Sequence, residues 1–276
     1  MAHLTRFILL TSIRTGSTML ASGLNTNPEI VCFGELFNLS VEYVGFNVAG
    51  YDNNSPEDRA LRDKDFKAFL ERRIFSQPEP VRAAGFKAIR EEMPYFPGLW
   101  DWLAAQRDIH AINLRRRNLV RSLVSWRIAE ATGEWVVTKP QPFASRSPLL
   151  TPARLAVRSV RRLLGASKQA VAPAPRKTIT LSAEECRSYF DSVEQTTDKY
   201  ARLFEGHPLQ TVYYEELVGD HGRTLAEVQS FLGVTPRGLS FTTRRQNPEP
   251  LRTLITNYGE LRQAFLSTPY APFFDD

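Results

Sequence analysis

The sequence has few of the residues that build metal centres and disulfide frameworks. It contains two cysteines in 276 residues, Cys32 and Cys186, and its four histidines are scattered along the chain. It has no CxxC pair and no HExxH motif, which argues against a disulfide-stapled fold and against a sequence-local zinc site. We therefore expect free thiols, a reducing compartment and no metal in the functional site.

Long hydrophobic runs are also lacking. The apolar run nearest the N-terminus covers only residues 7–10, which is shorter than the core of about 7–15 residues found in a signal peptide. No stretch approaches the roughly 20 apolar residues that a membrane-spanning helix needs. The sequence predicts a cytoplasmic protein that is not exported.

The composition is that of a globular protein, with 42% hydrophobic and 24% charged residues. A chain of this length should bury roughly 75% of the surface that its unfolded form exposes. The core is therefore large enough to fold without staples. We expect a single domain over residues 1–276.

Positive charge is concentrated in one segment. Eight of the 35 basic residues and none of the 30 acidic residues lie between residues 141 and 177, so the rest of the chain carries 27 basic against 30 acidic residues. This balance does not indicate nucleic-acid binding. Six prolines in residues 140–177 suggest an insertion or lid, whose residues 154–164 form a basic amphipathic pattern. A surface helix packed on the body, an anionic acceptor site and contact with a membrane surface remain alternatives.

Strands and helices alternate along the chain. Apolar runs predict strands at residues 6–11, 29–33, 85–89, 108–114 and 211–214. Helical spacing and capping signals predict helices that begin near residue 17 and at 56–77, 94–106, 118–131, 182–204 and 224–232. This order favours a three-layer α/β fold with a mostly parallel sheet flanked by helices.

The first strand is followed by the loop sequence SIRTGST. The chain passes here from a strand through a glycine-containing loop to the start of a helix. This arrangement directs backbone N–H groups and the positive end of the helix dipole at one point, which suits a phosphate or sulfate group. The loop is P-loop-like but is not a Walker A motif, because no lysine follows Gly16. The alternative is an ordinary turn in which Ser17 and Thr18 cap the helix.

A second basic group follows the predicted strand at residues 108–114. Arg115, Arg116 and Arg117 are adjacent there, and Ser125 lies eight positions beyond Arg117. Ligands of open α/β sheets bind outside the carboxyl ends of strands. The arginines are therefore candidates for a second anion contact, and a solvated charge run is the alternative.

These motifs, with VYYEEL at 212–217 and FLGV at 231–234, resemble the sulfotransferases that use 3′-phosphoadenosine 5′-phosphosulfate (PAPS). The likeness covers residues 4–135 and 180–272 and is nearest to soluble bacterial members that act on carbohydrates or small metabolites, including the trehalose 2-sulfotransferase and nodulation-factor groups. It implies a 5′-phosphosulfate loop made by Arg14, Thr15, Gly16, Ser17 and Thr18. It also implies a 3′-phosphate pair of Arg117 and Ser125, with Arg116 as the alternative one residue earlier. Residues 244–246 and 250–258 resemble the segment that closes over the nucleotide.

Sulfuryl transfer from PAPS requires in-line attack and neutralisation of the leaving oxygen. We expect Arg14 to neutralise charge on the bridging oxygen, and Glu35, just after the second predicted strand, to accept the proton of an acceptor hydroxyl or amine. A structural ion pair is the alternative role for Glu35. Lys87 could reach the same cleft, and no role is assigned to it.

Two other functions remain open on the sequence. One is a P-loop-type kinase or nucleotide hydrolase, which the missing P-loop lysine disfavours. The other is a non-catalytic module that binds an acidic polymer through residues 141–177. The acceptor, the choice between O- and N-sulfation and the oligomeric state cannot be predicted from the sequence, because substrate contacts come from variable loops and insertions.

Overall fold

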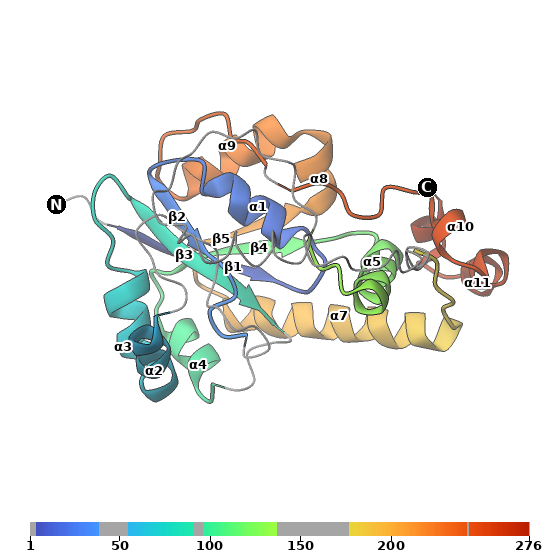
Figure 1. Ribbon diagram of the computed structural model, residues 1–276, viewed down its shortest axis with the longest axis horizontal. Helices are drawn as coiled ribbons and strands as arrows, with labels where there is room; N and C mark the ends of the chain where they lie inside the picture. Colours follow the sequence, from blue (N-terminus) through green and yellow to red (C-terminus); the bar gives the residue numbers. More distant parts are fainter. Residues whose placement is uncertain (1–3, 39–54, 91–95, 137–176, 242, 276) are drawn as a thin grey trace, which may run out of the picture.

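The computed structural model describes residues 4–38, 55–90, 96–136, 177–241 and 243–275. Five parallel strands form one sheet in the order β2-β3-β1-β4-β5 (Figure 1). Their bounds are Thr5–Thr11 for β1, Ile30–Phe33 for β2, Ala83–Ile89 for β3, His110–Arg115 for β4 and Leu209–Tyr213 for β5. The predicted strands are thus all present, and the parallel sheet is confirmed.

The strand register places the ends of neighbouring strands, and the loops that follow them, next to one another. Thr11, the last residue of β1, pairs with Ile89 of β3 on one side and with Leu114 of β4 on the other. Next along the sheet, Arg115 of β4 pairs with Tyr213 of β5. After β1 the chain adds β2 and β3 on one side of β1, and it then crosses over to add β4 on the other side. The gap between the ends of β1 and β4 is therefore the switch point where ligands of such sheets bind.

Helices cover both faces of the sheet, which makes the three layers visible in Figure 1. On one face, α1 (Ser17–Leu24), α8 (Tyr214–Gly219) and α9 (His221–Phe231) pack on apolar side chains of all five strands. On the other face, α3 (Phe66–Phe69), α4 (Leu99–Ala105) and α7 (Ala183–Leu203) cover a second apolar cluster rich in phenylalanine.

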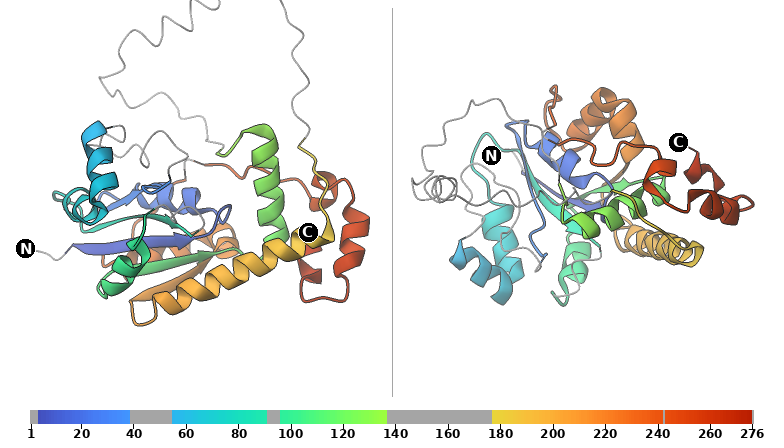
Figure 2. Two further views of the ribbon diagram at one scale, coloured as in Figure 1. Left: turned by 90° about the horizontal axis from the view of Figure 1, so that it is seen from below. Right: turned by 45° about the vertical axis from the view of Figure 1, so that its right-hand side comes forward.

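A third apolar cluster lies beyond the sheet. It joins α5 (Leu119–Thr132) and α7 to the C-terminal elements α10 (Leu251–Leu254), α11 (Tyr258–Phe265) and η2 (Ala271–Phe274). In both views of Figure 2 the long helix α7 extends from beneath the sheet toward these elements. The two C-terminal α-helices and η2 were not predicted, because α10 is a single turn and the aromatic side chains nearby follow no clear period.

Helix bounds are determined by identifiable caps. Asn118 accepts a hydrogen bond from the backbone N–H of Arg121 at 2.8 Å, and Ser182 accepts one from the N–H of Glu185 at 3.0 Å. Both residues begin the helices that the sequence predicts. The Glu185 carboxylate pairs with Arg127 at 3.1 Å, so it links α7 to α5.

The single helix predicted over residues 56–77 is wrong. The chain forms α2 (Pro56–Lys64), then α3 and then a π-helical turn, η1 (Leu70–Ile74). Asp65 breaks the run because it adopts an extended conformation, with φ −151°, and caps α3 by accepting from the N–H of Ala68 at 3.0 Å. The local side-chain cap outweighs the helical period here.

Other bounds differ by a few residues. The helix predicted at 94–106 begins at Leu99, and the one at 224–232 begins earlier, at His221. Tyr214, predicted as the end of a strand, starts α8. The predicted basic helix at 154–164 and nearly all of the 140–177 insertion lie outside the described residues. Among the residues that are described, no helix is long and apolar enough to cross a membrane.

Candidate active site

The loop after β1 is shaped by Gly16. This residue is the N-cap of α1 and has φ +88°, a left-handed conformation that favours glycine. A methyl group in place of its hydrogen would lie 2.5 Å from Cδ2 of Tyr214. The loop and the Tyr214 ring can therefore approach this closely only because residue 16 has no side chain.

The first turn of α1 offers backbone donors to a ligand. Because the N-cap is glycine, no side chain caps the helix, and the first turn contains no acidic residue. The interpretation in which Ser17 and Thr18 merely cap the helix therefore does not hold. The N–H groups of an uncapped first turn, together with the helix dipole, favour an anion.

Arg14 connects the loop to two other segments. It is a non-glycine residue with φ +59°, and its guanidinium donates to the Ser125 hydroxyl at 3.0 Å, to the carbonyl of Trp135 at 2.7 Å and to the side chain of Gln246. Burial lowers the pKa of Arg14, and the nearby Tyr189 and Glu35 partly offset this effect. Its charge therefore lies in a poorly solvated place, where an anion would be well bound.

Arg116 lies beside the same loop. Its guanidinium is 4.5 Å from the centre of the Tyr214 ring and donates to the backbone oxygen of Arg14 at 3.1 Å. Its Nε atom is buried and has no acceptor among the described residues. Burial lowers the pKa of Arg116 to about 10, so the group remains charged at neutral pH. Gly16 and Arg116 thus both contact Tyr214, which places the ends of β1 and β4 around one site.

Arg117 points elsewhere. Its guanidinium pairs with Glu216 at 2.5 Å and stacks on Tyr213 at 3.8 Å. It lines a second, smaller cavity of about 260 Å³, together with Thr15. The Thr15 hydroxyl donates to the carbonyl of Ser12 at 3.0 Å. Arg116 lines this second cavity too, but Thr15 and Arg117 do not line the main cavity described next.

The remaining predicted site residues line one cavity of about 1030 Å³. Among the described residues that line it, six are basic and one, Glu35, is acidic. The basic residues are Arg14, Lys87, Arg116, Arg121, Arg244 and Arg245. Such an excess of cations suits a ligand with several negative charges. The predicted residues Gly16, Ser17, Thr18 and Ser125 also line this cavity.

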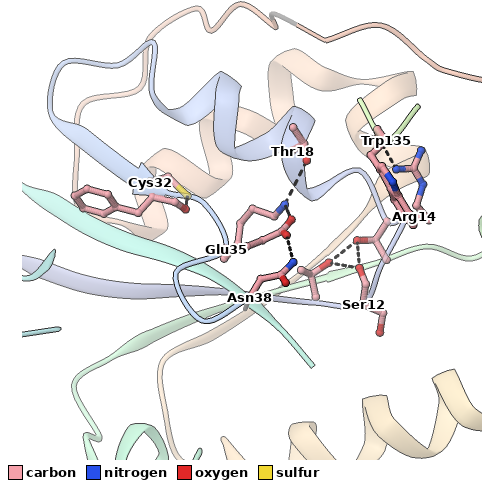
Figure 3. Close-up of polar contacts among 11 residues, drawn as sticks. Ser12, Arg14, Thr18, Cys32, Glu35, Asn38 and Trp135 are labelled. Atoms are coloured by element: carbon pink, nitrogen blue, oxygen red, sulfur yellow. Dashed lines mark hydrogen bonds and ion pairs between the residues drawn. The ribbon is translucent and has the colours of Figure 1, made fainter. Parts of the chain in front are cut away.

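Glu35 lies at one end of the cavity, after β2. Its Oε1 atom accepts from Nζ of Lys87 at 2.5 Å, and its Oε2 atom accepts from the amide of Asn38 at 2.9 Å. Lys87 also donates to the Thr18 hydroxyl at 3.3 Å. In Figure 3, Thr18 of α1 lies close to Glu35 and Asn38, which both belong to the segment after β2.

Another part of the cavity lining is aromatic and apolar. It is lined by Tyr214, Leu217, Val218, His221 and Phe241. The flat rings and aliphatic side chains there suit a heterocyclic base. A ligand with a base and several phosphate or sulfate groups therefore matches the cavity as a whole.

Several lining residues were missed by the sequence analysis. Arg121 contacts the segment at residues 247–249, where it donates to the carbonyl of Glu249 at 2.7 Å. Asn38 donates to Glu35 and orients its carboxylate. Neither belongs to a recognisable spacing pattern. Lys87 did carry a signal, since it is the one charged residue in the apolar run AAGFKAI.

No cluster of three or more metal-ligating side chains is found within the described ranges. The two cysteines are free and buried. Burial raises the pKa of Cys32 to about 12, so its thiol is not poised as a nucleophile at neutral pH.

Two relatives match almost the whole chain. Nodulation protein H of Rhizobium tropici is 28% identical over 276 residues, covering 98% of this chain and 92% of the relative. Nodulation protein H of Rhizobium meliloti is 26% identical over 278 residues, covering 98% and 94%. No protein-family model matches the chain.

A solved structure is also similar to this chain. The sulfotransferase from Alicyclobacillus acidocaldarius aligns with a TM-score of 0.48 at 17% identity, over 99% of this chain and 93% of the other.

Proposed function

We propose that this chain is a sulfotransferase, which transfers a sulfuryl group from PAPS to a hydroxyl or amine of a carbohydrate or small-metabolite acceptor. The observation that carries the proposal is the charge pattern of the main cavity, where six cations and the uncapped first turn of α1 face one carboxylate. PAPS has negative charge at two places, and the cavity has cations at two neighbouring strand ends.

The donor would be held by both strand ends. The N–H groups at Gly16, Ser17 and Thr18 would bind the 5′-phosphosulfate, and Arg14 would neutralise charge on the bridging oxygen. Arg116 and Ser125 would bind the 3′-phosphate. We assign this contact to Arg116 because its guanidinium lines the main cavity, whereas that of Arg117 pairs with Glu216.

Glu35 would act as the base at the other end. The acceptor hydroxyl gives its proton to the Glu35 carboxylate while its oxygen forms a bond to sulfur. The bond from sulfur to the bridging oxygen breaks, and its electron pair stays on the 5′-phosphate of the leaving nucleotide. A positioned base is worth about 10²–10⁴ in rate.

Binding of adenosine 3′,5′-bisphosphate tests the donor assignment. Titration calorimetry without magnesium should give sub-millimolar affinity, and ATP with magnesium should bind more weakly. Preference for magnesium and ATP would support a kinase or hydrolase instead. No binding of either nucleotide, with polyanion binding that disappears on deletion of residues 141–177, would support the non-catalytic module.

Turnover identifies the acceptor class. The chain should be incubated with ³⁵S-labelled PAPS and a panel of sugars that includes trehalose and N-acetylglucosamine oligomers, and with a parallel panel of small metabolites. Label should pass to a hydroxyl- or amine-bearing compound in one panel. Nucleotide binding without transfer to any member of either panel would contradict the acceptor class.

A further inference from the structure

We propose that Lys87 is a positioning residue of the reaction, which holds the Glu35 carboxylate ionised and oriented and links it to the loop that binds the sulfuryl donor. The inference rests on the proposed function, because it needs Glu35 as the base. It adds a residue to the machinery and a way in which proton transfer and sulfuryl transfer are coupled.

The burial of Lys87 is the first observation. The residue lies in β3, two positions before the strand ends at Ile89, and its side chain is only 3% exposed. A buried ammonium group is costly unless it is paired. Its hydrogen-bond partners include Thr18 and Glu35, and both line the main cavity. The presence of a lysine at this position is therefore explained by its contacts at the cavity and not by packing in the apolar core.

The geometry of the carboxylate is the second observation. Lys87 bonds Oε1 of Glu35 at 2.5 Å, and Asn38 bonds Oε2 at 2.9 Å. Each carboxylate oxygen has two lone pairs. With one partner on each oxygen, the two contacts fix the plane of the carboxylate.

The surrounding charges favour ionised Glu35. Among the described residues, the groups that face it include the Lys87 ammonium, the Asn38 amide and, at longer range, the Arg14 guanidinium, whose own pKa is influenced by Glu35. The Cys32 thiol lies near Lys87 and is neutral at neutral pH. Both charged neighbours are cations, and cations favour the charged form of a carboxylate.

This arrangement couples the two halves of the reaction. Before transfer, the ammonium charge is balanced by Glu35. When Glu35 takes the acceptor proton it becomes neutral, and the ammonium then faces Thr18 in the first turn of α1 without that counter-charge. The positive charge is thus released next to the proposed sulfuryl position as negative charge moves from the acceptor to the donor.

Titration of Glu35 tests the inference without an acceptor. In protein labelled with ¹³C at the glutamate carboxyl, the Glu35 signal is the one missing from Glu35→Gln. In Lys87→Met its titration midpoint should rise by about one pH unit or more relative to the wild type. Lys87→Arg, which retains the charge, should keep the midpoint near the wild-type value. Lys64→Met, which removes an exposed lysine of α2, should not change it.

The outcomes separate this inference from the proposed function. An unchanged midpoint in folded Lys87→Met overturns the role of Lys87, even if wild-type protein binds adenosine 3′,5′-bisphosphate and transfers sulfate. Failure of the wild type to bind that nucleotide overturns the proposed function, whatever the titration gives. If Lys87→Met does not fold, Lys87→Gln serves in the same titration.

A kinetic readout distinguishes positioning from a purely structural role. With an acceptor found in the panels above, Lys87→Met should lower kcat about tenfold or more and move the acidic limb of its pH profile upward. Affinity for adenosine 3′,5′-bisphosphate should stay within about twofold. A loss of nucleotide affinity equal to the loss of kcat would contradict the inference.

Discussion

The proposed donor end and the proposed acceptor end of the main cavity are built in different ways. The proposed donor end consists of main-chain N–H groups at the start of α1 and of guanidinium groups from the loops after β1 and β4. The acceptor end consists of one carboxylate, Glu35, held by Lys87 and Asn38. A ligand at the proposed donor end would meet many donors at once, whereas an acceptor would meet one proposed base, which pairs with the buried Lys87.

This difference predicts which substitutions should change ligand affinity and which should change turnover. Loss of one cation at the donor end leaves several others in the cavity, so the effect should appear mainly in affinity. Glu35 is the only acid among the described residues that line the cavity, so loss of its carboxylate should appear in turnover. Four experiments test this division, in order of decreasing effect.

Removing the base should have the largest effect. Glu35→Gln keeps the shape of the side chain but cannot accept a proton at neutral pH, so turnover should fall by about 10²–10⁴. Affinity for adenosine 3′,5′-bisphosphate should remain within about twofold by calorimetry. Glu184→Gln, on the exposed side of α7, is the matched control and should be fully active. Near-normal turnover of Glu35→Gln would remove this residue from the mechanism.

Two adjacent arginines provide a matched pair at the donor end. Arg116→Met should weaken binding of adenosine 3′,5′-bisphosphate by about 10–100-fold, because it removes a charge-assisted contact in a poorly solvated place. Arg117→Met should change affinity less than about threefold, since its guanidinium is half exposed and pairs with Glu216. The reverse ranking would show that Arg117 is the 3′-phosphate residue.

Two glycines with positive φ allow the stability cost of backbone strain to be measured separately from the cost of a close contact. Gly133→Ala requires only a left-handed alanine, because nothing lies within 4 Å of the added methyl group. It should lower the free energy of unfolding by about 1 kcal/mol. Gly16→Ala also places a methyl group 2.5 Å from Tyr214 and should cost about 1–3 kcal/mol more. Urea unfolding measures both, and equal costs would mean that the contact of Gly16 with Tyr214 is not tight.

Salt should affect the two ends unequally. Raising ionic strength from about 0.05 M to 0.5 M shortens the range of charge interactions several-fold. Affinity for the nucleotide should fall by about tenfold, and KM for an uncharged sugar acceptor should change by less than about twofold. A similar response of both constants would mean that the ends do not differ in their dependence on charge.

The strand, loop and helix start at the proposed donor end could be predicted from the sequence because they depend on local order. A buried strand, a glycine loop and a helix start adjacent in the chain are enough to aim backbone N–H groups at one point. The register of the arginines could not be predicted, because whether Arg116 or Arg117 faces the cavity depends on how Glu216 and Tyr214 of α8 pack.

The acceptor end could be predicted only in part. Glu35 was recognisable by its position after a strand, but its pairing with Lys87 joins residues 52 positions apart and depends on the pairing of β2 with β3. The helix break at Asp65 was missed for a similar reason, since a single side-chain cap decided it against the apolar period.

The most direct measurement is a crystal structure of the chain with adenosine 3′,5′-bisphosphate. The account predicts the 5′-phosphate at the N–H groups of residues 16–18, the 3′-phosphate between Arg116 and Ser125, and the base against Tyr214 and Phe241. A nucleotide that touches only one of the two strand ends, or that binds outside this cavity, would contradict it.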